Sequence, residues 1–163
     1  MDSHGVPWVA CDGSSCLVNI DPRTMELSEY KLPDPKTTVW RLDFASDGML
    51  WYVNSHQGRL GRFNPKTGKV KEWPSPNGPK LHPYAIAVVD DIVWYNESRM
   101  RLDTRVRFDS ASETFQSWAI PSGGIHAGIV RHMRPTREGN LLIHQSGTNR
   151  ILLVTLKAPA AIQ

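Results

Sequence analysis

The chain has 163 residues, of which 40% are hydrophobic and 21% charged, with a net charge of +3. This balance is typical of a folded globular chain and excludes an intrinsically disordered one. Lysine and arginine are scattered among acidic residues, so the sequence predicts no nucleic-acid partner. Because no apolar stretch approaches the length of about 18 residues that crosses a bilayer, it predicts no membrane partner.

The first residues, Met1–Gly5, contain neither a basic region nor an apolar one, so no signal peptide is visible. The sequence as it stands predicts a cytoplasmic chain; a longer chain that continued before Met1 would be periplasmic or secreted. Cys11 and Cys16 are too few ligands for a structural zinc site, which needs four. Two free thiols are favoured over a disulfide across the intervening turn, because disulfide geometry is demanding.

Short apolar runs follow one another in four units along the chain. Trp8, Trp51 and Trp94 recur every 43 residues and give the period of the repeat. Several runs alternate in polarity, as in Arg105–Phe108, and Asp-Gly or Asn-Pro turn signals separate the runs, which is typical of short strands. The strands expected in chain order are Trp8–Val9, Leu17–Asp21 and Leu27–Leu32; Val39–Phe44, Leu50–Tyr52, Leu60–Phe63 and Val70–Trp73; Tyr84–Val89, Ile92–Tyr95, Arg105–Phe108 and Phe115–Ile120; and Val130–Met133, Leu141–Ile143 and Arg150–Val154.

A meander of up to four strands in each unit of about 43 residues predicts an all-β fold, a β-propeller of four-stranded antiparallel blades. A β-sandwich is the structural alternative, but it does not predict so long a period. The blades are expected at about 5–38, 39–81, 82–127 and 128–156, followed by a tail at 157–163. The first and last blades hold three strands each in this count. Their free edges predict either a homodimer that completes the propeller or a fragment of a longer chain.

Several segments carry a family resemblance. Leu50–Tyr52, Gly58–Gly68 and Glu72–Pro74 resemble the repeat of the virginiamycin B lyase (streptogramin B lyase) family, and Val93–Glu97 looks like another copy of its tryptophan-to-glutamate strand. The resemblance covers nearly the whole chain. It implies the C-terminal half to two-thirds of a propeller of six or seven blades.

The resemblance also implies a chemistry. Members of this family open cyclic depsipeptide antibiotics by elimination at the ester, with Mg²⁺. A Glu-Xaa-His at the start of an inner strand supplies a metal ligand and the base, and a second glutamate lies near the end of the next strand. In this chain the corresponding segments read His82–Tyr84 and Val130–His132, so only His132 is retained as a possible base. Glu97 stands at about the second glutamate position and is the predicted metal ligand.

The starts of inner strands line the mouth of a propeller's channel, where ligands bind. His132 is therefore the predicted catalytic residue, with a histidine that only satisfies backbone groups as its alternative. For Glu97, the alternative to a metal ligand is an ordinary ion pair with Arg99 or Arg101. The predicted substrate-binding residues are Arg41, Tyr84, His82 and Arg131.

Two functions follow. One is a carbon–oxygen lyase, similar to virginiamycin B lyase, which acts on a cyclic depsipeptide or related lactone with Mg²⁺ as its cofactor. The other is a non-catalytic propeller that binds a small molecule or a protein partner at its central channel.

Overall fold

The computed structural model describes residues 1–98, 103–121 and 129–156. The described residues form strands joined by turns, and no helix among them is long or apolar enough to cross a membrane. The strands are β1 (Trp8–Cys11), β2 (Cys16–Ile20), β3 (Leu27–Lys31), β4 (Val39–Phe44), β5 (Leu50–Asn54), β6 (Arg59–Phe63), β7 (Val70–Pro74), β8 (His82–Val89), β9 (Ile92–Ser98), β10 (Thr104–Asp109), β11 (Thr114–Ala119), β12 (Val130–Pro135), β13 (Leu141–Gln145) and β14 (Arg150–Val154).

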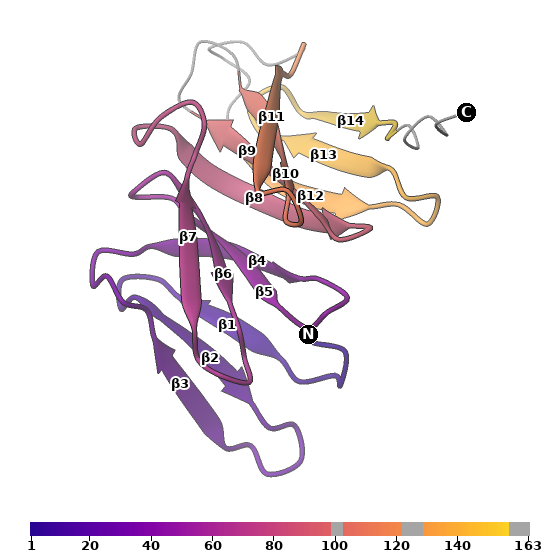
Figure 1. Cartoon of the computed structure of the whole chain (residues 1–163). Helices are drawn as coiled ribbons and strands as arrows, with labels where there is room; N and C mark the ends of the chain where they lie inside the picture. Colours follow the sequence, from indigo (N-terminus) through magenta and orange to yellow (C-terminus); the bar gives the residue numbers. More distant parts are fainter. Residues whose placement is uncertain (99–102, 122–128, 157–163) are drawn as a thin grey trace.

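The strands form four antiparallel sheets, each built from neighbours in the sequence (Figure 1). The first sheet contains β1–β3, the second β4–β7, the third β8–β11 and the fourth β12–β14. Among the described residues, the predicted strand count of three, four, four and three is confirmed. Each sheet lies within one predicted unit, while the end of the third unit at 122–127 and the tail at 157–163 lie outside the described residues.

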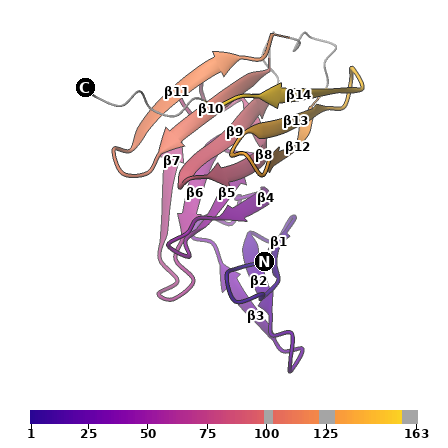
Figure 2. The same cartoon turned by 90° about the vertical axis from the view of Figure 1, so that its right-hand side faces the viewer.

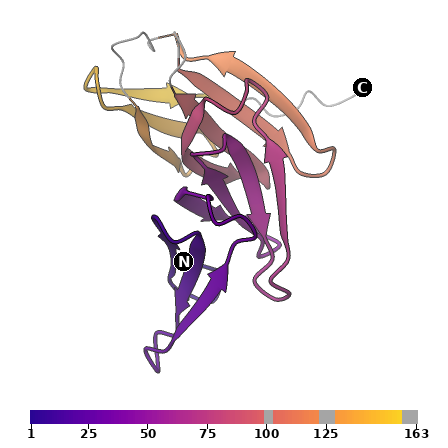
Figure 3. The same cartoon turned by 90° about the vertical axis from the view of Figure 1, so that its left-hand side faces the viewer.

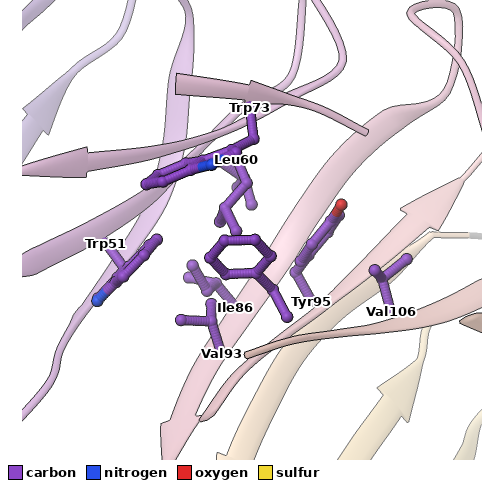
Figure 4. Close-up of a cluster of buried hydrophobic side chains, with 9 residues drawn as sticks. Trp51, Leu60, Trp73, Ile86, Val93, Tyr95 and Val106 are labelled. Atoms are coloured by element: carbon purple, nitrogen blue, oxygen red, sulfur yellow. The ribbon is translucent and has the colours of Figure 1, made fainter. Parts of the chain in front are cut away.

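The sheets follow one another in an arc, with the first sheet at one end and the fourth at the other (Figure 3). Three buried apolar clusters lie between successive sheets, one at each junction. In the middle cluster Trp51, Leu60 and Trp73 of the second sheet point toward the third sheet (Figure 4). The predicted packing role of the tryptophans Trp8, Trp51 and Trp94 is confirmed, since each is less than 9% exposed and belongs to one of these clusters.

The innermost strands of the last three sheets are β4, β8 and β12, as the sequence predicts. Strand β8 lies between the other two, and it begins at His82, two residues earlier than expected. Its side chains alternate: Ile86 packs toward the second sheet, whereas Ala85 and Ala87 pack toward the fourth. This alternation is the two-residue period of a strand that is buried on both faces.

The expectation of free thiols at Cys11 and Cys16 is wrong: the structure joins them in a disulfide. The two residues are direct partners across the β1–β2 hairpin, and their Cα atoms are 5.3 Å apart. This separation lies in the usual range for a disulfide. Four residues of turn bring the two cysteines opposite one another, and the sequence pattern alone did not reveal that register.

Candidate functional site

Each of the three inner strands contains a shift of register against its neighbour. The shifts lie between Val39 and Leu42 in β4, between Pro83 and Ile86 in β8, and between Val130 and His132 in β12. A bulge of this kind adds a residue to one strand and turns its side chain out of the regular alternation. The residues inside the bulges are Trp40, Arg41, Tyr84, Ala85 and Arg131.

Four of these residues meet around one aromatic ring, and we call them the aromatic–arginine cluster: Trp40, Arg41, Tyr84 and Arg131. The centroids of the Trp40 and Tyr84 rings are 4.6 Å apart. The guanidinium carbon of Arg41 lies 5.1 Å from the centre of the Tyr84 ring, and that of Arg131 lies 5.9 Å from it. Both distances fall within the range of a cation–π contact. The structure therefore brings together three of the four predicted substrate-binding residues and adds Trp40.

The cluster continues into a small depression of about 40 Å³. Eight residues of the three inner strands line it, and three of them, Arg41, Arg131 and Arg134, carry a fixed positive charge beside His132. Within the described part of the chain, none of these arginines forms an ion pair with a carboxylate. A positive surface without counter-charges attracts anionic or carbonyl-bearing ligands.

His132 is exposed at the border of this depression. Partial burial lowers the pKa of its imidazole, and the positive charges of Arg41 and Arg134 lower that pKa further. This lowered pKa favours the neutral imidazole at pH 7, the form that accepts a proton. The ring of His144, on the adjoining strand β13, lies 6.4 Å away between centroids.

Glu97 and His82 lie apart from the residues that line the depression. Glu97 is completely buried near the end of β9, where Asn77 Nδ2 donates a hydrogen bond to its Oε2. Burial raises the pKa of this carboxyl, and no described residue bonds its other oxygen, Oε1. His82 begins β8 opposite Ser98. Arg99 and Arg101, the alternative partners of Glu97, lie outside the described residues.

The position of Glu97 recurs in neighbouring sheets. Asn54, Glu97 and Gln145 each lie at or next to the end of the second strand of their sheet, and each is completely buried. Asn54 Nδ2 donates to the Thr37 hydroxyl in the loop that enters β4, and Glu97 accepts from Asn77 in the loop that enters β8. The side chains of Asn54 and Glu97 therefore fasten the loop before an inner strand. The repeat already identifies Asn54 as the residue that corresponds to Glu97 in the second unit, but it did not predict that both side chains bond the preceding loop.

The donor set around His132 does not suit Mg²⁺. By the resemblance, the two glutamate positions beside this histidine are those of Val130 and Gln145, which are direct partners in β12 and β13. Neither supplies the carboxylate oxygen that Mg²⁺ prefers. Among the described residues there is also no group of three histidine, cysteine, aspartate or glutamate side chains that could hold a metal ion.

Solved structures similar to this chain are propellers. The virginiamycin B lyase from Staphylococcus aureus superimposes with a TM-score of 0.78 at 19% identity, over 99% of this chain and 55% of that one. The fold is a β-propeller. A catalytically inactive variant of the same lyase, with quinupristin, gives a TM-score of 0.76 at 19% identity, again over 99% and 55% of the two chains.

A propeller with another role is also similar. YCF48 bound to D1 peptide gives a TM-score of 0.71 at 15% identity, over 96% of this chain and 48% of that one. No protein-family model and no curated protein matches the sequence. At these identities the likeness establishes the propeller fold, and the chain spans about 55% of the length of the lyases.

Proposed function

We propose that this part of the propeller binds a small ligand that carries carbonyl or carboxylate oxygens beside a flat apolar group. The observation that carries the proposal is the aromatic–arginine cluster, where Arg41 and Arg131 share the ring of Tyr84 without a carboxylate partner among the described residues. Arg41 Nη1 donates to the Trp40 carbonyl, and the remaining N–H donors of guanidinium groups that rest on a ring are available to a ligand. Trp40, which is 40% exposed, adds an apolar surface beside those donors.

The ligand class proposed is a cyclic depsipeptide or related lactone. Such a ligand combines several carbonyl oxygens with aromatic or aliphatic side chains, which matches donors placed next to an exposed indole. The structural likeness to a lyase that has been crystallised with quinupristin supports the same class. Quinupristin is therefore the first compound to test.

The binding test is calorimetric titration of quinupristin into the full chain. We expect saturable binding that weakens about tenfold in Arg131→Gln, because a hydrogen bond to a charged group contributes about 1.5–3 kcal/mol. Arg137→Gln is the matched control, since Arg137 is an exposed arginine of the turn that follows β12 and lies outside the cluster. Equal affinity in the parent and in Arg131→Gln, or no binding at all, would contradict the proposal.

A second candidate is eliminative opening of the ester, and the neutral state of His132 favours it. His132 Nε2 or Nδ1 would take the proton beside the carbonyl; the C–O bond would break as the new C=C bond forms, and the oxygen would leave as a carboxylate. The product keeps the mass of the substrate, whereas hydrolysis adds one water. Mass spectrometry of quinupristin incubated with the chain, with and without Mg²⁺, separates the outcomes.

Ring opening by the parent chain that is lost in His132→Asn would support the lyase reaction. Tight binding with an unchanged ligand, with or without Mg²⁺, would leave binding as the function and exclude this reaction. Because the donor set at His132 lacks carboxylates, we expect added Mg²⁺ to change neither the binding affinity nor the melting temperature. A rise in both with Mg²⁺ would show that a metal site exists.

A further inference from the structure

A groove of about 470 Å³ is lined by residues of β11, the outer strand of the third sheet, and of β14, the last described strand of the fourth. Figure 2 shows the positions of these two strands. This volume is in the range of about 300–1,000 Å³ found for binding pockets. Most of the lining is apolar and comes from Trp118, Ile143, Leu152 and Val154. Arg105 is the charged residue of the lining.

The groove lies at the place of a fourth strand. The second and third sheets each end in an outer strand, β7 and β11, whereas in the described part of the chain the fourth sheet ends at β14. Strand β14 therefore pairs with β13 along one edge, and its other edge has no described neighbour. The N–H and C=O groups of such an edge bind a further extended strand.

The register shows what side chain is absent from the groove. Phe108 in β10 lies opposite Val93, and Val154 in β14 lies opposite Leu141, so Val154 occupies the place of Phe108 in its sheet. In the third sheet, Phe108 is paired with Phe115 of the outer strand, with ring centroids 4.6 Å apart. The fourth sheet has the smaller valine and no described counterpart of Phe115, which leaves the groove open.

In the third sheet, a carboxylate lies two residues before that aromatic side chain. Trp73 of the second sheet donates its indole N–H to Glu113 Oε2 of the third sheet, over 3.2 Å, and Glu113 precedes Phe115 by two positions. Trp118 occupies the place of Trp73 in the third sheet, because each faces the equivalent residue of its neighbouring strand. The second sheet has Gly68 at this place, so the acid is not general. An acidic residue at the same place in a strand added to β14 would lie near Trp118, as Glu113 lies near Trp73.

The groove supplies a positive charge to meet this acid. Where the second sheet has Leu60 opposite its outer tryptophan, the third has Arg105. Its guanidinium carbon lies 5.3 Å from the Trp94 ring and 5.1 Å from the Trp118 ring. Its Nε is buried, and no described residue accepts its hydrogen bond. A partly buried cation without an acceptor favours a carboxylate on the incoming partner.

We propose that this groove binds an extended peptide segment of another protein. The segment pairs antiparallel with β14 and carries an acidic residue followed, two positions later, by an aromatic or large aliphatic residue. The aromatic side chain packs against Trp118 and Val154, and the carboxylate pairs with Arg105. A second copy of this chain is the poorer occupant, because every strand of the described residues already belongs to a sheet.

The probe is a fluorescein-labelled peptide with the sequence Ser112–Ala119, which contains Glu113 and Phe115 in the required spacing. Fluorescence anisotropy with the full chain should give a saturable curve. Peptides with Glu113→Gln or Phe115→Ser should bind at least tenfold more weakly. Hydrogen exchange of β14 should slow when the peptide is present, because its edge N–H groups become bonded.

The matched variants of the chain are Arg105→Leu and Val9→Ser. Arg105→Leu introduces the residue that the second sheet has at this place, so the fold is retained. This variant should bind the parent peptide at least tenfold more weakly. Its affinity for the Glu113→Gln peptide should equal that of the parent chain. Val9→Ser, at the opposite end of the molecule, should leave the affinity for every peptide unchanged. Absence of saturable binding, equal affinity for all three peptides, or a chain that sediments as a dimer and excludes the peptide would overturn the proposal.

Discussion

The ring of Tyr84 contacts two guanidinium groups, those of Arg41 from the second sheet and Arg131 from the fourth. This arrangement sets the chemistry of the candidate site. Two like charges repel each other, and the electron-rich ring of the tyrosine compensates part of that repulsion. The remaining positive charge is available to a ligand. Removal of the ring should disturb both arginines together, so Tyr84→Ala should weaken quinupristin binding more than Arg41→Gln does, as measured by calorimetric titration. A weaker effect of Tyr84→Ala than of Arg41→Gln would contradict this role of the ring.

The affinity for an anionic ligand should depend on the protonation of His132. Partial burial and the charges of Arg41 and Arg134 lower the pKa of this histidine below its ordinary value of 6.5, and His144 and Arg131 add to the effect. A bound carboxylate favours the protonated imidazole, so affinity should rise several-fold as the pH falls from about 7 to about 5. Calorimetric titration of an N-acetylated aromatic amino acid across this range measures how the affinity changes with pH. His132→Asn should remove this pH dependence. A pH dependence that persists in the variant would assign the titration to another group.

The buried carboxyl of Glu97 should make the fold less stable as the pH rises. Burial raises its pKa in the folded state above the value in the unfolded state, so the folded chain resists ionisation. Stability is then lost as the pH rises from the unfolded pKa through the folded one. We expect Glu97→Gln to become more stable relative to the parent as the pH increases from about 4 to 8, as measured by urea unfolding. A difference that does not change with pH would contradict this account.

Not all of the site could be predicted from single residues. Arg41, Tyr84 and Arg131 were predicted because the repeat places them at or beside equivalent inner-strand positions. Trp40 was missed, because only the bulge in β4 turns it toward Tyr84, and a bulge has no reliable signature in the sequence. The packing role of Asn54 became visible only once the register was known.

At the scale of the elements, alternation of polarity predicted strands with one buried face, such as β10. Strands β5, β8 and β9 are buried on both faces, and their apolar runs between turn signals predicted them instead. One close contact shows what alternation leaves out. The Tyr52 ring lies over Gly61 on the neighbouring strand, and a Cβ atom at Gly61 would overlap that ring. Gly61→Ala should therefore cost about 1–3 kcal/mol of unfolding free energy in urea titrations, the usual range for overpacking. The control is the same substitution in a Tyr52→Ala background, where the ring is absent and Gly61→Ala should cost less. An equal loss in both backgrounds would argue against the Tyr52 contact.

The disulfide fastens the β1–β2 hairpin at the edge of the first sheet. A crosslink over a short loop reduces the entropy of the unfolded chain, and Cys11→Ser should lower the unfolding free energy by about 2 kcal/mol. Urea unfolding of the oxidised parent, the reduced parent and the variant measures this. The reduced parent should behave as the variant does; if all three unfold alike, the crosslink adds nothing to stability.

At the scale of the whole molecule, each sheet packs only against its neighbours in the arc, as in repeat proteins. Described residues cover the second and third sheets on both faces and the first and fourth sheets on one. Exposed apolar residues gather on the two end sheets, and they include Val9 and Leu27 in the first and Ile151 and Leu153 in the fourth. The end sheets should therefore open more readily than the middle ones.

Hydrogen exchange measured by mass spectrometry tests this order and the predicted homodimer together. In dilute solution, peptides from β5 and β9 should exchange more slowly than peptides from β3 and β14, because opening of a middle sheet disrupts two clusters and opening of an end sheet only one. If a second copy covers the ends, the end sheets should become protected as the concentration of the chain rises, by mass action. Protection that is uniform at every concentration would contradict the ordered opening, and end sheets that stay unprotected at high concentration would exclude the homodimer.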